Sequence, residues 1–328
     1  MRSDCEQIPG GFTKEEADRA ETMEAALVPR PGARSARAAA GCQVYWPAPY
    51  EVCGAIKDKY NELGGPNSFL LWPTSNELTN PDGVGRRNTF TNGPIYWSPW
   101  GGAHPVVNHF FAAWQRNGWE GGALGYPTSD EYVNPDGVGR RQEFQHAGIY
   151  WRLNEAYAIG GALRGRWNDT GAEAGPLGYP TSDELAVNRD SGRYNNFENG
   201  TITWSGPMGT RILFGAIRDR WAEVGREDGA LGLPLTDEQV AGDGIGHYVF
   251  FENGSAIYYL PIVGAWRISP FVLNVWIELG GERSVLGYPI ENPRTTDLDP
   301  GVVMAQVFQN GGIAYTDQDI AYIADYGN

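Results

Sequence analysis

The sequence predicts an α+β repeat protein in which short helices alternate with small antiparallel strands and hairpins, arranged as a pseudo-five-fold, closed, propeller-like ring. Three observations lead to this class: a recurring LGYP motif, an aromatic residue at a fixed distance before it, and a phenylalanine after it. The motif prolines are Pro73, Pro127, Pro180, Pro234 and Pro289, at steps of 53 to 55 residues. So regular a period indicates one supersecondary unit stacked on itself.

Each unit is expected to contain one helix and one buried strand. The helix aromatic stands thirteen positions before the proline, at Tyr60, Trp114, Trp167, Trp221 and Trp276. Around the fourth of these, Ile217, Trp221 and Val224 have helical spacing and Gly225 supplies a C-cap. The phenylalanine follows at Phe90, Phe144, Phe197, Phe251 and Phe308. Because every unit needs these residues, we expect them in the core.

Residues 1–41 carry none of these markers. Thr13 and Glu16 form a capping-box pattern ahead of good helix formers, which predicts a helix from about Lys14 to Leu27 followed by a linker. The pattern is compatible both with a helix docked on the repeats and with a mobile leader. The repeat region is then 42–328, with copies at about 44–97, 98–151, 152–204, 205–259 and 260–323.

The array begins and ends in mid-unit. Six hairpins are expected against five helices, the first near Val44 to Val52 and the last near Ile313 to Ile323. A boundary of this kind lets the terminal strands meet and hides their edges, which favours a closed ring. An open solenoid is the alternative.

Composition narrows the function classes. Forty acidic against twenty-five basic residues give a net charge of −15, which opposes binding to nucleic acid. The sequence has no run of eighteen apolar residues, which predicts no membrane insertion, and its start lacks the apolar core of a secretory signal. Export would therefore require a signal that is absent from this sequence.

The three cysteines favour one disulfide. In CQVYWPAPYEVC the two halves can fold back at Pro47 and Ala48, which places Cys42 opposite Cys53 in a two-stranded ribbon. A bridge would imply an oxidising compartment, and a pair of buried thiols is the alternative. Cys5 has no evident partner.

The segments ALGYPTSDE and FENGTITW, with the tryptophan upstream, resemble the LGFP repeat of secreted proteins of mycolic-acid-containing actinobacteria. The resemblance extends over five copies, from about residue 43 to 325. It implies a module that anchors proteins to cell-wall polysaccharide, either arabinogalactan or peptidoglycan, with secreted envelope enzymes as further partners. Leu71 and Leu233 depart from the motif, and the fifth copy lacks the Thr-Ser-Asp-Glu element.

Adjacent carboxylates recur after the motif and are candidate ligand contacts. Asp130 with Glu131 and Asp183 with Glu184 can accept hydrogen bonds from neighbouring sugar hydroxyls or hold a hard cation. Alternatively, one acid of each pair caps a short helix or turn while the other faces solvent.

Arginines and isolated tryptophans complete the candidate site. Arg140 and Arg193 follow the glycine-rich loops and can contact an anionic polymer, or pair with the repeated acids as salt bridges between repeats. Trp100, Trp119 and Trp266 lie outside the five-fold frame, so packing of the unit does not require them. A sugar ring can stack on such faces, and local packing is the alternative.

No catalytic signature accompanies these residues. GxSxG, HExxH, Walker and dinucleotide motifs do not occur, and the four histidines lack ligand spacing. The sequence thus predicts a non-catalytic, secreted, cell-wall-associated module without cofactor or metal, which binds polysaccharide at several equivalent grooves between repeats. A scaffold that docks a secreted protein is the alternative, and a two-carboxylate glycoside hydrolase is the third reading.

Overall fold

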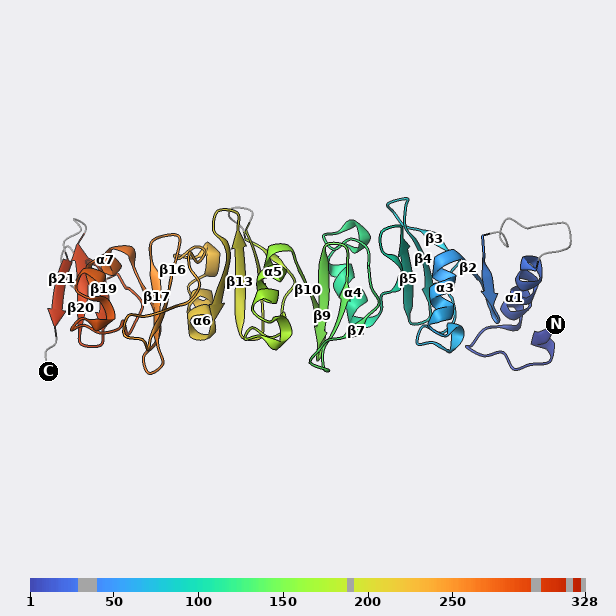
Figure 1. Ribbon diagram of the computed structural model, residues 1–328, viewed down its shortest axis with the longest axis horizontal. Coiled ribbons are helices and arrows are strands. Elements are labelled where there is room, and N and C mark those ends of the chain that lie inside the picture. The colour runs from blue at the N-terminus through green and yellow to red at the C-terminus, as the bar shows by residue number, and fades with distance from the viewer. Residues whose placement is uncertain (29–39, 188–191, 296–301, 317–320, 326–328) are drawn as a thin grey trace. The chain divides into compact units, whose positions relative to one another are not determined.

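The computed structural model describes residues 1–28, 40–187, 192–295, 302–316 and 321–325 (Figure 1). The chain divides into two compact parts, Met1–Gly161 and Ala162–Asn328. Most of the linker predicted after the first helix lies outside the described residues. Within those residues, no helix is both long enough and apolar enough to cross a membrane.

The first part contains a two-stranded sheet and two four-stranded antiparallel sheets, in the orders β1-β2, β3-β4-β5-β6 and β10-β9-β8-β7. Its elements are η1 (Arg2–Asp4), α1 (Lys14–Leu27), β1 (Gln43–Tyr45), β2 (Ala48–Val52), α3 (Gly54–Glu62), η2 (Gly65–Asn67), β3 (Leu78–Thr79), β4 (Arg86–Phe90), β5 (Gly93–Ser98), β6 (Gly102–Pro105), α4 (Asn108–Arg116), η3 (Trp119–Gly121), β7 (Tyr132–Val133), β8 (Arg140–Glu143), β9 (Ala147–Arg152) and β10 (Glu155–Gly160).

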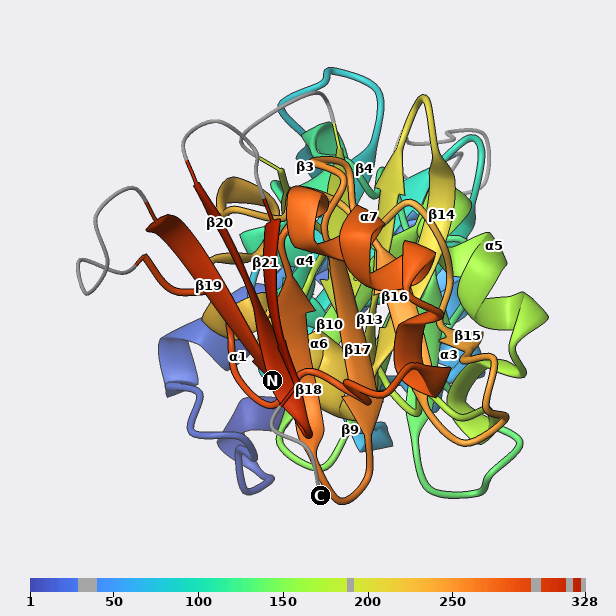
Figure 2. The ribbon, with the colours of Figure 1, turned by 90° about the vertical axis from the view of Figure 1, so that its left-hand side faces the viewer.

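The second part repeats the plan with two four-stranded sheets and a three-stranded sheet, β19-β20-β21, whose strands lie side by side in Figure 2. Its elements are α5 (Gly161–Asp169), η4 (Ala172–Ala174), β11 (Leu185–Ala186), β12 (Arg193–Asn196), β13 (Gly200–Ser205), β14 (Gly209–Phe214), α6 (Gly215–Glu223), η5 (Arg226–Asp228), β15 (Gln239–Val240), β16 (His247–Phe250), β17 (Ala256–Leu260), β18 (Gly264–Ile268), α7 (Pro270–Glu278), η6 (Gly281–Arg283), β19 (Val302–Phe308), β20 (Gly311–Thr316) and β21 (Ala321–Asp325).

The LGYP motif recurs because it joins the helix to the strand of each unit. All five helix aromatics are at most 1% exposed. The indole N–H of Trp114 donates to the carbonyl of Gly125, eleven residues on, and Trp167, Trp221 and Trp276 repeat this bond. The glycine has φ near 70°, a conformation that other residues adopt only with strain. The motif proline then bridges to the strand phenylalanine in every copy.

The predicted core is confirmed, and so is the predicted alternation of helices and hairpins. Helix α4 packs on β9 and β10, and α6 packs on β17 and β18, so each of these helices covers the sheet that follows it. Helix α1 occupies the corresponding place on β1 and β2. The N-terminal helix is therefore docked, and it begins with the predicted capping box of Thr13 and Glu16.

The closed ring is not confirmed. Among the described residues the six sheets are open and contain two to four strands each, and no sheet closes on itself. The repeated units of small antiparallel sheets and short helices are what the structure supports.

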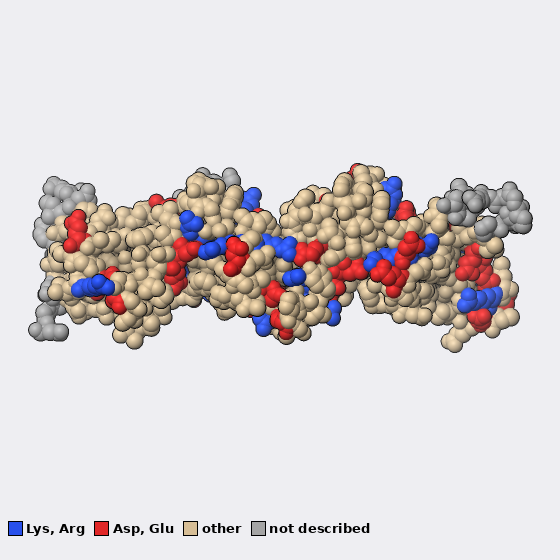
Figure 3. All heavy atoms as spheres, viewed as in Figure 1, with Lys and Arg blue, Asp and Glu red and all other residues tan. Residues whose placement is uncertain are grey.

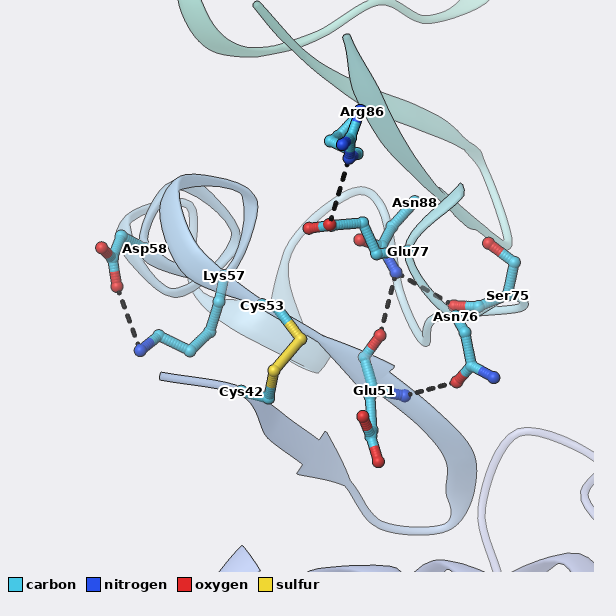
Figure 4. The surroundings of a disulfide bond; sticks show 10 residues. All are labelled: Cys42, Glu51, Cys53, Lys57, Asp58, Ser75, Asn76, Glu77, Arg86 and Asn88. Carbon is cyan, nitrogen blue, oxygen red and sulfur yellow. Dashed lines mark hydrogen bonds and ion pairs between the residues drawn. A yellow bond between two sulfur atoms is a disulfide. The ribbon is translucent and has the colours of Figure 1, made fainter. Parts of the chain in front are cut away.

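The predicted disulfide joins Cys42 and Cys53 beside the first hairpin (Figure 4). The turn lies one residue earlier than predicted, because Tyr45 pairs with Ala48 and leaves Trp46 and Pro47 at the tip. A register shift next to Val44 absorbs the difference. The shift restores the pairing that sets the two cysteines opposite each other. Cys5 is exposed and unbonded.

Candidate functional site

Two hollows in the first part combine aromatic and polar side chains. The larger, which we call the groove, has a volume of about 860 Å³ and lies between the sheet of copy one and the helical side of copy two. The smaller, which we call the recess, has a volume of about 250 Å³ and lies within copy two at the start of α4. The two hollows differ in how many of their charged side chains form ion pairs with each other.

The sheet wall of the groove comes from β4 and β5. Arg87 and Thr89 project from the same face of β4, because side chains alternate along a strand. Tyr96 pairs with Arg87 across the strands, and Pro94 pairs with Thr89. This wall therefore sets apolar ring surfaces beside a guanidinium and a hydroxyl.

The helical wall comes from α4 and the turn η3. Phe111 and Trp119 meet edge to face with ring centroids 4.9 Å apart, and Glu120 follows in the turn. Trp119 has a φ of 60°, and the equivalent residues of the other turns have φ between 51° and 62°: Gly65, Ala172, Arg226 and Gly281. The unusual backbone thus belongs to the scaffold, whereas the indole side chain is specific to copy two.

Arg87 keeps most of its hydrogen-bonding capacity free. It donates from Nη1 to Oδ1 of Asn80 at 2.7 Å, and its guanidinium lies 5.9 Å from the Tyr96 ring centre. Over the part of the chain that the structure describes, no carboxylate lies within ion-pair distance of Arg87. Over the same residues, no basic side chain lies within ion-pair distance of Glu120. The groove therefore offers both unpaired donors and an unpaired acceptor.

The equivalent arginine of copy two is satisfied internally. Arg141 lies 3.6 Å from the carboxylate of Glu143 and donates to the Tyr132 hydroxyl at 2.7 Å. Glu143 stands three residues after the first residue of its strand, where copy one has Thr89. The absence of a carboxylate at Thr89 is what leaves Arg87 available.

The recess is formed by residues that recur. Glu131 and Arg140 form an ion pair of 2.6 Å, and Trp151 lies opposite Arg140 in the sheet, with its ring 6.0 Å from His109. The Trp151 indole N–H is buried without a hydrogen-bond partner. A neighbouring hollow continues past Glu131 and Arg140 to Phe69 of copy one.

Copy one contains the same arrangement. Glu77, Arg86 and Trp97 line a hollow at the start of α3, and the Glu77–Arg86 distance is 3.8 Å (Figure 4). In copies three and four the pairs are Glu184 with Arg193 at 3.5 Å and Glu238 with His247 at 2.8 Å. These ion pairs of Arg140 and Arg193 with the repeated glutamates thus lie within a repeat, where the sequence predicted pairs between repeats.

Asp130 ties copy two to copy one. Its carboxylate contacts Lys59 at 3.1 Å and His104 at 2.6 Å. Burial alone would raise the pKa of Asp130, but the hydrogen bonds from His104 and Lys59 lower it below the ordinary value. The strand β7 follows Asp130, so among the described residues this acid caps no helix.

The same position ties copy four to copy three. Asp237 contacts Arg166 at 2.6 Å and accepts a hydrogen bond from the backbone N–H of Ile212, 25 residues before it. The residue 25 positions before Asp130 is Pro105, which has no N–H. The His104 ring supplies a donor to Asp130 instead.

Burial has the opposite effect on the second acid of the motif. It raises the pKa of Glu77, Glu184 and Glu238 above the ordinary value, and the nearby Arg86, Arg193 and His247 offset this only in part. The two adjacent acids therefore differ in role. The aspartate, as Asp130 and Asp237 show, forms an ion pair with the preceding copy, and the glutamate, as Glu77 and Glu131 show, lines a hollow.

The remaining candidates are dispersed. Trp100 is 62% exposed and lies 6.2 Å from the Tyr126 ring. Trp266 is half-buried, donates to the Val263 carbonyl, and has the Arg220 guanidinium 4.2 Å from its ring. Asp183 lies partly exposed beside Glu184. Of the predicted tryptophans, the groove therefore contains only Trp119 among the residues described.

Arg86 and Arg87 also follow a glycine-rich loop and are candidate contacts on the sequence alone, but apart from Trp119 the sequence did not indicate the rest of the groove. Arg86 and Arg87 are adjacent, but side chains alternate along the strand, so Arg86 lines the hollow at the start of α3 and Arg87 lines the groove. That alternation is a sequence signal that separates them. No sequence pattern places Phe111 and Glu120 beside Arg87, because they belong to the next copy.

The fold and the hollows define a class: a repeat protein with binding-sized hollows within and between its units. The chain belongs to the LGFP repeat family, whose sequence profile matches residues 70–122, 124–175, 177–229 and 231–284, more than half of its length.

Comparison with other proteins adds little to this. Among curated proteins, none matches the chain. A hemopexin fold protein, CP4 from cow pea, is 10% identical, with 60% of this chain and 92% of that chain covered and a TM-score of 0.17. Two structures of the extracellular domain of BT4673 from B. thetaiotaomicron are 11% identical, with 75% and 76% of this chain and 27% of theirs covered, at TM-scores of 0.15. TM-scores this low carry no argument about fold or function.

Proposed function

We propose that this protein is a non-catalytic module that binds cell-envelope polysaccharide at the groove between copies one and two. The observation that carries the proposal is the pairing of Trp119 and Phe111 with Arg87 and Glu120, charged groups that no ion pair satisfies. Sugars need apolar surface for their C–H faces together with donors and acceptors for their hydroxyls.

The arrangement of the acids supports binding over hydrolysis. A two-carboxylate glycosidase needs one carboxyl group free to donate a proton and a second facing it across the substrate. The acids predicted from the repeat are instead engaged by basic partners, as Asp130 is by Lys59 and Glu131 is by Arg140. The recess can serve as a secondary contact through the unpaired Trp151 indole.

Export, copy number and ring closure belong to the same proposal. The Cys42–Cys53 disulfide supports an oxidising compartment, as expected for a protein of an actinobacterial cell wall. The fifth copy repeats the internal contacts of the others, with Trp276 bonded to Gly287 and Pro289 bridged to Phe308. A closed ring of this length predicts a radius of gyration of about 20 Å in X-ray scattering. A clearly larger value would favour the open solenoid.

A pull-down tests the binding proposal. The purified chain is incubated with insoluble wall of a mycolic-acid-containing actinobacterium, before and after mild acid removes the arabinogalactan, with an unrelated acidic protein as control. Retention on at least one wall preparation, lost in Trp119→Ala, supports the proposal. Absence of retention on both preparations would contradict it, and the search would then turn to secreted protein partners.

A further inference from the structure

The charge of the groove restricts its ligand. Its lining includes two carboxylates, Asp82 and Glu120, against one guanidinium, Arg87. The Asp82 carboxylate accepts hydrogen bonds from the Tyr126 hydroxyl and from two backbone N–H groups, and these lower its pKa against the opposing effect of burial. Asp82 is therefore ionised at neutral pH, and the groove carries a net negative charge.

The composition of the chain is acidic as well. The chain has a net charge of −15, and on the face shown in Figure 3 acidic and basic side chains are intermixed and do not form a basic stripe. A polymer with regularly spaced carboxylates would meet like charge at the groove and gain no compensating steering.

The uncharged surface of the groove fits a sugar ring. Phe90, Pro94, Phe111 and Trp119 supply apolar area, and the hydroxyls of Thr89 and Thr91 lie along the same wall. A hydroxyl both donates and accepts, so a sugar with several free hydroxyls can use the unpaired donors of Arg87 and the unpaired acceptor of Glu120 together. A carboxylate ligand could use only the first.

We infer that the groove selects a neutral polysaccharide over carboxylate-bearing glycans such as peptidoglycan. The inference rests on the proposed glycan-binding function. It also places the selectivity in one groove, because Thr89 and Trp119 are not repeated at the corresponding positions of copy two or of the turns named above. The counterpart of Arg87 in copy two, Arg141, is ion-paired with Glu143.

Calorimetry with defined probes tests the inference. Soluble arabinogalactan fragments serve as the neutral probe, and soluble peptidoglycan fragments and polygalacturonate serve as the anionic probes. We expect binding to the neutral fragments alone, changing less than about twofold between low and high salt because no counterions are released. In Glu120→Lys we expect the anionic fragments to gain about tenfold in affinity.

The outcomes separate the two proposals. Tighter binding of the anionic fragments by the unaltered protein would overturn the selectivity and leave the glycan-binding function standing. Binding of the neutral fragments that is equal in Trp119→Ala would place the site elsewhere and overturn the inference. If no probe binds and the protein is also not retained on the wall, both the glycan-binding function and the selectivity are contradicted. Circular dichroism of each variant confirms that it is folded.

Discussion

The groove and the recess lie on the same pair of repeats but are built differently. The recess uses a glutamate, an arginine and a tryptophan that return in several copies, and its charges pair with each other, as Glu131 does with Arg140. The groove uses Thr89 and Trp119, which are not repeated, and Arg87, whose counterpart Arg141 is ion-paired with Glu143. Among the described residues, Arg87 and Glu120 form no ion pair. Recurrence thus marks the residues that maintain the scaffold, and departure from the repeat marks the candidate binding residues.

The largest expected effect comes from removing the indole of the groove. Trp119→Ala should lower affinity for the wall polysaccharide by about 2 kcal/mol, or close to thirtyfold, because a tryptophan at the centre of a binding surface is a typical hot spot. Calorimetry measures the change. Trp266→Ala is the matched control, since its indole bonds within its own hairpin, and it should bind like the unaltered protein. Equal losses in both variants would break the distinction between groove and scaffold.

A smaller effect should follow from giving copy one the carboxylate of copy two. Thr89→Glu places an acid where Glu143 stands and should pair with Arg87, as Glu143 does with Arg141. We expect affinity to fall about tenfold, the cost of two lost hydrogen bonds, with little change in melting temperature. Glu143→Thr is the reciprocal variant and should not weaken binding. Unchanged affinity in Thr89→Glu would show that the free guanidinium is not used.

Removing the charge of Asp130, which pairs with Lys59 of copy one, should lower the stability of the protein in a way that depends on pH. Asp130→Asn should lower the free energy of unfolding by about 1 kcal/mol at pH 7. The folded-state pKa of Asp130 is lowered, so the stabilisation is present above the ordinary value of 3.8 and disappears as the pH falls through the folded-state value. Urea unfolding at pH 7 and pH 3 measures this. A difference that stays constant with pH would contradict the ion-pair account.

The smallest expected effect is a gain of stability on removing the charge of Glu77, which lines the hollow at the start of α3. The pKa of Glu77 is raised by burial, so its ionised form weakens the folded state. Glu77→Gln should therefore stabilise the protein by about 0.3 kcal/mol at pH 7, with the gain vanishing as the pH falls below the ordinary 4.5. The same unfolding series reports it. Destabilisation at pH 7 would show that the weak contact with Arg86 outweighs the burial.

The repeat made the scaffold predictable. A fixed spacing identified Trp114 and its equivalents as core and located the hairpins. The fold-back of the first hairpin, a local pattern as well, set Cys42 opposite Cys53. The groove was not predictable in the same way. It depends on which face of β4 carries Arg87 and on a wall contributed by the next copy, where Phe111 gives no local signal.

The role of Asp130 shows a second limit. It depends on Lys59, 71 residues away in sequence, and on a proline at position 105 that removes a backbone donor. Neither feature is visible in the motif that contains Asp130. Contacts between copies such as that of Asp130 with Lys59 therefore required the structure.

The most direct test of the central claim follows individual indole N–H signals by NMR while the protein is titrated with soluble arabinogalactan fragments. The chain has twelve tryptophans, and single substitutions assign the signals of Trp119, Trp97 and Trp151. The account predicts that the Trp119 signal shifts first and most, while the signals of Trp151 in the recess and of Trp97 in the equivalent hollow of copy one move little. Shifts confined to Trp97 and Trp151 would place the ligand in these two hollows and contradict the assignment of the groove as the binding site.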